Sequence, residues 1–205
     1  RGVTPFVLTE RAAHQNSRRA FDGTVRRYTL DPGPVRFIRF DDSLAEFKPL
    51  RYFTGRRILL RELISRQMRL QACIAQEDFV TNKSMQSVLP ISGGPNLNFL
   101  LGVINSHLLS WYFLQRSNVG HRDDFPKIVL KETRELPIPK QSLCSTGEGR
   151  RQVREIVDLV ERILAAKRAG AAADTSAWER EIDERVYRLY GLTPEEIKIV
   201  EEGVK

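Results

Sequence analysis

The apolar segment at residues 97–116 restricts the possible folds more than any other feature of the sequence. Its large side chains recur three and four residues apart, which predicts one helix with a broad buried face; they are Leu97, Leu100, Leu101, Ile104, Leu108, Trp111 and Tyr112. Polar residues interrupt the apolar run, at Asn98, Asn105, Ser106, His107 and Ser110. A membrane span needs about 20 nearly uninterrupted apolar residues, so we expect a core helix and no membrane partner.

The other apolar segments before residue 140 are short and alternate like strands. Residues 35–40 alternate between apolar and basic residues, which predicts a half-buried strand, and residues 56–62, with apolar residues between arginines, are a second strand candidate. Two short extended pieces are expected in residues 79–89, around a turn at Asn82, and another strand at 128–130. Residues 1–34 contain many turn-forming residues. No strand–helix–strand repeat is visible, so we expect a small mixed β-sheet with packed helices.

The last 65 residues predict helices. Residues 141–149 have the composition of a linker, and amphipathic segments follow at 151–167 and 176–190. Ser176 and Glu179 match a capping box, Gly191 is placed as a C-cap, and Thr193 is placed to begin a short third helix. The residues expected to pack the two longer helices together are Ile156, Val160, Ile163, Trp178, Ile182 and Val186.

These patterns predict an α+β protein in two parts. The first, residues 1–140, holds the mixed β-sheet and its packed helices, and the second, residues 150–205, is a C-terminal helical hairpin. The chain begins with Arg1 rather than Met, which indicates a fragment of a longer protein. Its two cysteines, Cys73 and Cys144, are too few for a secreted disulfide scaffold and favour a cytoplasmic protein with reduced thiols.

Positive charge is concentrated in the first part. Residues 1–140 carry 22 Lys and Arg against 13 Asp and Glu, a net charge of +9, whereas residues 141–205 carry 11 against 13, a net charge of −2. A basic part followed by a slightly acidic one is the pattern of a protein that meets a polyanion.

Motifs for catalysis are missing from the sequence. It has neither a glycine-rich phosphate loop nor the nucleophile elbow of hydrolases nor the His-Glu-x-x-His zinc motif. The histidines and cysteines show no metal spacing. Asp41, Asp42, Glu46 and Lys48 superficially resemble a metal-dependent nuclease site, but we interpret them as a solvated acidic turn.

Three polar and basic segments are candidates for contacts with DNA, because arginine suits phosphates and guanine edges while amides and hydroxyls suit base edges and backbone. The first is a run of arginines at Arg51, Arg56, Arg57, Arg61, Arg66 and Arg69. The second comprises Asn82, Lys83 and Ser84, and the third comprises His121, Arg122 and Lys127. The stretches between them are apolar, so we expect burial to bring these segments together at one rim of the sheet.

Several motifs, in this order, resemble the TaqI-like C-terminal specificity domain of adenine-specific DNA methyltransferases from restriction–modification systems. They are FVTNKS at 79–84, LLGVINSHLLSWYF at 100–113, DFPKI at 124–128 and LPIP at 136–139. The opening RGVTPF and the helical tail at 178–202 resemble the corresponding parts of the same enzymes.

The resemblance implies a non-catalytic DNA target-recognition domain that holds double-stranded DNA for an N-terminal methyltransferase catalytic domain of the same chain. That missing domain is expected to bind S-adenosylmethionine, and this fragment no cofactor, because the Asn-Pro-Pro-aromatic motif and a cofactor glycine loop are absent from its sequence. Two alternatives stay open: a metal-dependent nuclease domain and an unrelated nucleic-acid-binding module.

Overall fold

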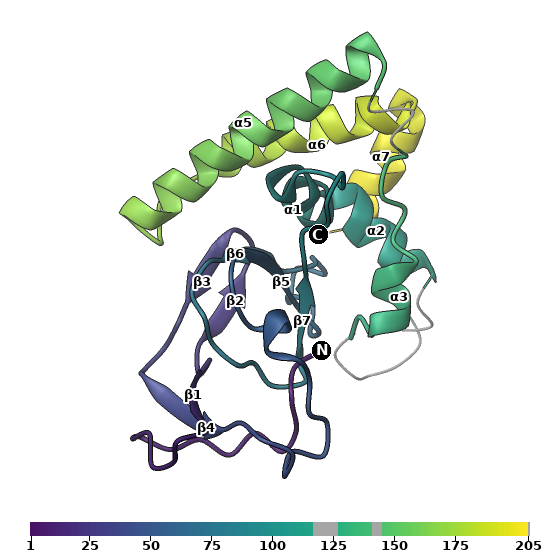
Figure 1. Cartoon of the computed structure of the whole chain (residues 1–205). Helices are drawn as coiled ribbons and strands as arrows, with labels where there is room; N and C mark the ends of the chain where they lie inside the picture. Colours follow the sequence, from purple (N-terminus) through teal and green to yellow (C-terminus); the bar gives the residue numbers. More distant parts are fainter. Residues whose placement is uncertain (117–126, 141–144, 205) are drawn as a thin grey trace.

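The strands form three small antiparallel sheets, drawn in Figure 1. The structure is a computed structural model that describes residues 1–116, 127–140 and 145–204. The pairs are β1 (Ser17–Ala20) with β4 (Arg36–Arg39) and β2 (Thr24–Arg26) with β3 (Thr29–Asp31), while β5 (Arg57–Arg61) lies between β6 (Ala72–Ala75) and β7 (Met85–Val88). Parallel pairing occurs at isolated bridges, such as Val3 with Asn82.

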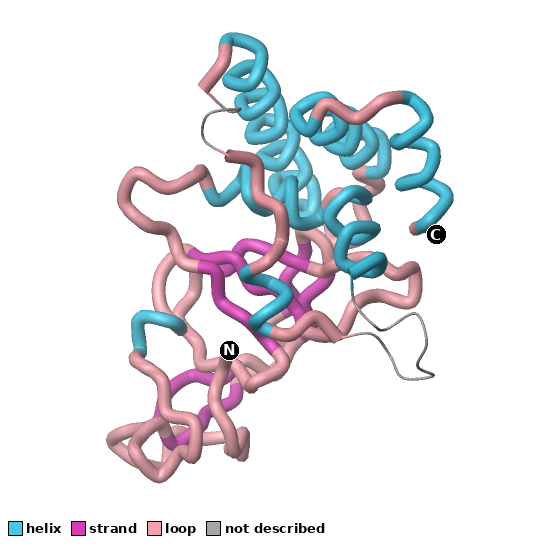
Figure 2. Tube along the Cα trace, turned by 90° about the vertical axis from the view of Figure 1, so that its right-hand side faces the viewer, coloured by secondary structure: helices cyan, strands magenta, loops and turns pink. Residues whose placement is uncertain are grey.

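Helices gather on one side of these sheets, as Figure 2 shows. The described helices are the 3-10 turn η1 (Leu50–Tyr52), α1 (Leu97–Asn105), α2 (His107–Arg116), α3 (Leu130–Arg134), α5 (Gly147–Ala169), α6 (Ser176–Tyr190) and α7 (Pro194–Gly203). The long helices α5 and α6 run side by side as the expected hairpin. The α+β class with a C-terminal helical region is therefore confirmed.

The segment at 97–116 forms two helices instead of the predicted single one. Ser106 has an extended backbone, with ψ of 159°, and α1 and α2 meet there at 60°. His107 is the first residue of α2, so its amide has no partner in a preceding turn of that helix. Asp183 of α6 accepts a hydrogen bond from this amide at 2.7 Å, which stabilises the break. Among the described helices none alone is long and apolar enough to cross a membrane, although the bent pair of α1 and α2 reaches that length and composition.

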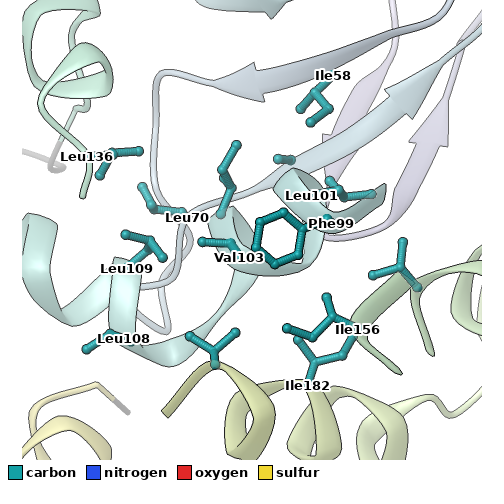
Figure 3. Close-up of a cluster of buried hydrophobic side chains, with 14 of the residues drawn as sticks. Ile58, Leu70, Phe99, Leu101, Val103, Leu108, Leu109, Leu136, Ile156 and Ile182 are labelled. Carbon is teal, nitrogen blue, oxygen red and sulfur yellow. The ribbon is translucent and has the colours of Figure 1, made fainter. Parts of the chain in front are cut away.

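The largest core cluster lies between the central sheet and the helices, and Figure 3 shows part of it. Ile58 of β5 points into it beside Leu101 of α1, and Ile156 of α5 and Ile182 of α6 close it from the other side. This core joins residues of both sequence parts. Gly102 permits the close approach, because a Cβ there would lie 2.7 Å from a methyl group of Ile156.

The central strand β5 is covered on both faces. Its Ile58 and Leu60 belong to the helix-side core, while Leu59 packs into a second cluster with Phe21, Val25, Phe79 and Met85. The strand expected in residues 56–62 is confirmed as β5, and the N-terminal segment covers the face opposite the helix-side core.

Other local predictions had mixed outcomes. The strand expected at 128–130 is absent from the described structure: Lys127 forms one bridge with Leu63, and Leu130 already begins α3. The turn-rich segment 1–34 contains three strands, and α5 begins at Gly147, inside the predicted linker.

Of the three helix caps predicted in the tail, one was placed wrongly. The N-cap of α6 is Thr175 and not Ser176, and the Thr175 hydroxyl donates to the Glu179 carboxylate at 2.7 Å. Gly191 ends α6 in the left-handed conformation, with φ of 69°, as expected of a C-cap. Thr193 caps α7 in a reciprocal capping box with Glu196.

Candidate nucleic-acid interface

A tight hairpin turn connects β5 to β6 and projects three exposed side chains. The Met68 amide donates to the Ser65 carbonyl and the Ser65 amide to the Arg69 carbonyl, both at 2.9 Å, which closes a loop of Arg66, Gln67 and Met68. Met68 has the positive φ of 57° that the last position of such three-residue loops requires. We call residues 66–68 the hairpin tip.

Two other predicted segments meet the chain where β5 ends. The Glu62 amide donates to the Ser84 carbonyl, and the Ile128 amide donates to the Glu62 carbonyl, both at 2.8 Å. Asn82 accepts from the Ser84 amide at 3.0 Å, and this turn leaves Lys83 exposed between them. Of the predicted contact residues, Arg61 and Arg66 thus lie with the Asn82–Ser84 turn and Lys127 at one end of the central sheet.

A groove of about 620 Å³ runs beside the hairpin tip, lined by Arg61, Arg66 and Gln67 together with Arg26 of β2. A second groove of about 480 Å³ shares Arg26 and Gln67 with the first and extends toward Lys167 of α5. The two grooves adjoin each other between the small β2–β3 sheet and the hairpin.

Five cations around this end of the sheet make no ion pair with any described residue, and we call them the basic rim. They are Arg26, Arg61, Arg66, Lys83 and Lys127. The neighbouring cations are neutralised, because Arg27 pairs with Glu179 and Arg1 pairs with Glu62. The basic rim therefore offers its charges to an external anion.

Arg26 was missed by the sequence analysis, which treated residues 1–34 as turns. The signal was the alternation in Thr24, Val25 and Arg26: the valine is fully buried and the arginine is exposed on the neighbouring position of β2. Three residues are a short run for detecting a strand by period.

Arg57 is a correction to the predicted contact residues. It is 0% exposed, and its guanidinium donates to the carbonyl oxygens of Gly55 (2.8 Å), Glu77 (2.9 Å) and Phe79 (3.3 Å). It also lies over the Phe79 ring, 4.7 Å from the centroid, and burial lowers its pKa. Because every face of this side chain is covered, it ties the Gly55 and Glu77–Phe79 segments together and presents nothing to a ligand.

Two further arginines lie away from the basic rim. Arg51 is exposed on η1, with its guanidinium 5.3 Å from the Tyr52 ring centroid. Arg56, before the first residue of β5, donates to Asn98 at 2.7 Å and so lies at the opposite end of that strand from Arg61. His121 and Arg122 lie outside the described residues.

Arg69 anchors the base of the hairpin. Its buried guanidinium donates to Nε2 of His107 and to the Asn105 carbonyl, both at 2.7 Å, and burial lowers its pKa to about 10. The other ring nitrogen of His107, Nδ1, lies 2.6 Å from a carboxylate oxygen of Asp183. This arrangement requires His107 to accept at Nε2 and donate from Nδ1, and it links the hairpin to the α1–α2 break and to α6.

The acidic turn at Asp41 is organised by its own neighbours. The carboxylate accepts from the Ser43 hydroxyl and from Arg39 Nε, both at 2.6 Å, and these contacts hold the pKa of Asp41 well below its usual range. Within the described ranges no three His, Cys, Asp or Glu side chains gather closely enough to hold a metal ion. The geometry gives no support to the nuclease alternative.

Comparison with known proteins gives two results. Residues 18–138 match the TaqI-like C-terminal specificity domain. The chain is also 29% identical over 119 residues to a putative type II restriction enzyme and methyltransferase from Methanocaldococcus jannaschii. The aligned region covers 57% of this chain and 10% of that protein, so the chain matches about a tenth of the length of its curated relative.

Proposed function

Because the chain belongs to the family of TaqI-like C-terminal specificity domains, we propose that it recognises a sequence in duplex DNA and holds that duplex for methylation by a separate catalytic domain. The observation that carries the proposal is the basic rim, where cations from four separate chain segments gather at one end of the central sheet without an ion-pair partner among the described residues. Phosphate contacts supply most of the affinity of such proteins, and contacts with base edges supply the sequence choice.

Salt dependence tests the contact with DNA. If four or five of the rim cations each neutralise one phosphate, the slope of log affinity against log salt is expected to be about −3.6 to −4.5. The measurement is a fluorescence anisotropy titration of the whole chain with a labelled mixed-sequence duplex at several salt concentrations. A slope near zero would refute the proposal.

Single substitutions sharpen this test. Arg61→Ala and Lys83→Ala should each weaken binding and reduce the slope by about one, because each removes one phosphate contact. Lys198→Ala is the matched control: it also removes an exposed cation, but from α7 in the helical layer, where Lys198 faces Glu202 at 3.8 Å. Equal effects at Lys198 and at the rim would mean that only the total charge matters.

The catalytic partner is proposed to be an adenine-specific methyltransferase domain, joined to this chain in one cytoplasmic polypeptide and binding S-adenosylmethionine itself. The relative's description as a restriction enzyme and methyltransferase supports this arrangement. An enzyme that methylates a base in a duplex must extrude that base from the stack, and a firmly held duplex makes the extrusion site-specific.

Three measurements test the division of labour. Isothermal titration of this chain with S-adenosylmethionine should give no heat of binding, and a tight complex would contradict the proposal. In the joined polypeptide, Arg61→Ala should raise KM for DNA and leave KM for S-adenosylmethionine unchanged. The methylated nucleoside, identified by mass spectrometry, should be N6-methyladenine.

A further inference from the structure

We propose that the hairpin tip reads base edges through Arg66 and Gln67, while the other cations of the basic rim hold phosphates. The inference rests on the proposed function and divides its surface into two roles. It starts from a contrast in geometry: the tip is a closed turn of three exposed residues, whereas Arg26 and Arg61 are the last residues of the strands that line the same groove.

The shape of the tip suits a DNA groove. Paired strands lie about 4.8 Å apart, and the major groove, about 12 Å wide, admits a two-stranded ribbon. All three tip residues are exposed in succession, and Met68 keeps 40% of its surface in solvent although it is apolar. The turn therefore presents its side chains outward, as a probe that enters a groove must.

The chemistry of the tip matches base edges. Arginine can bond both O6 and N7 of guanine, glutamine can bond N6 and N7 of adenine, and an apolar side chain can contact the thymine methyl group. The side chains of Arg66 and Gln67 form no hydrogen bond or ion pair with any residue that the structure describes. The guanidinium of Arg66 and the amide group of Gln67 are therefore available to a ligand.

The tip is held rigidly from behind, which base reading requires. Arg69, the first residue after the tip, is bound by His107 and Asn105. The amide of the next residue, Leu70, donates to the Ser110 hydroxyl at 3.2 Å. The tip is thus fastened to both helices of the bent pair before any ligand arrives. A site pre-organised in this way loses less conformational entropy on binding.

Selection from a pool of randomised duplexes, followed by sequencing, tests the inference on the whole chain. The wild type should recover one motif. Arg66→Lys, which keeps the charge but loses the planar fork, should relax one position of that motif, and Gln67→Ala should relax another. Each should weaken binding to the recovered motif by roughly 5- to 150-fold and leave affinity for random duplex nearly unchanged.

Arg61→Ala is the matched control on the same groove. It should weaken binding to every duplex alike and recover the wild-type motif. If Arg66→Lys and Gln67→Ala also recover the wild-type motif, or if Arg61→Ala alters it, the division of roles is wrong while the proposed function stands. If the wild type itself recovers no motif, both the proposed function and this inference are overturned. Thermal melts of the variants should match the wild type, because Arg66 and Gln67 are exposed and Arg61 is partly exposed.

Discussion

The replacement Arg57→Ala should destabilise the protein and leave its affinity for DNA unchanged. Sequence patterning alone places Arg57 among the DNA contacts, but the structure places its side chain at 0% exposure between Gly55 and the Glu77–Phe79 segment. The variant therefore separates a structural role from a binding role at a single residue.

The expected magnitude follows from the partners that the guanidinium leaves behind. Three backbone carbonyls lose a charged donor, and a buried acceptor without a partner costs about 1–3 kcal/mol. The contact with the Phe79 ring is lost as well. The variant no longer has to desolvate a guanidinium, which offsets part of this loss, so we expect a net decrease of about 3–5 kcal/mol in the free energy of unfolding.

Urea denaturation and thermal melting measure this decrease. In a protein of this size 1 kcal/mol shifts the midpoint by about 2–4 °C, so the melting temperature should fall by roughly 10 °C. Arg56→Ala is the matched control, because that exposed neighbour makes one side-chain hydrogen bond, to Asn98, and its loss should cost below about 1.5 kcal/mol.

Two results would refute this reasoning. If Arg57→Ala melts with the wild type, the three carbonyl contacts do not stabilise the fold. If it melts normally and loses DNA affinity at a temperature where it is folded, Arg57 contacts DNA and its burial is wrong.

Three further outcomes are expected. Gly102→Ala should lower the free energy of unfolding by about 1–3 kcal/mol in urea denaturation, because its Cβ would lie 2.7 Å from a methyl group on α5. The control Gly147→Ala lies in open space at the start of α5 and should cause no loss of stability. Equal losses in the two variants would contradict the packing. In a Cys144→Ser background, Cys73 should resist a thiol reagent at pH 8 in the folded protein and react once urea unfolds it, because burial raises its pKa to about 12 and the thiolate is the reactive form; rapid labelling of the folded protein would count against this. Trp178→Ala should cost about 1–2 kcal/mol, below the 3–5 kcal/mol of a fully buried ring, because Trp178 is half-buried beneath the Arg162 guanidinium; a melting loss at the higher value would show that the ring is a core residue.

The gathering of three polar segments at one rim was an inference from the sequence, and part of each segment does lie at the end of β5: Arg61 and Arg66, the Asn82–Ser84 turn, and Lys127. Alternation of apolar and polar stretches was enough for this, because burying the apolar stretches brings the polar ends of strands to the same edge. The structure added Arg26 to the rim and removed Arg51, Arg56 and Arg57 from it.

The C-terminal helices were determined by the sequence alone in nearly every respect. Their apolar period, the glycine that ends α6 and the capping box at Thr193 are local signals, since they act over three to seven residues. Even the error at the N-cap of α6 was a shift of one residue, from Ser176 to Thr175.

Only the tertiary structure decided which arginines are buried and which are exposed. Arg57 and Arg61 stand on the same face of one strand and look equivalent in sequence. Gly55 and the Glu77–Phe79 segment enclose Arg57, whereas Arg61 lies at a groove. Arg66 and Arg69 likewise differ because Asn105 and His107, more than 35 residues along the chain, bind only the latter. An arginine side chain can be buried when carbonyl oxygens surround its guanidinium and accept its hydrogen bonds. Those oxygens come from segments far away in the chain, so no local sequence pattern encodes their position.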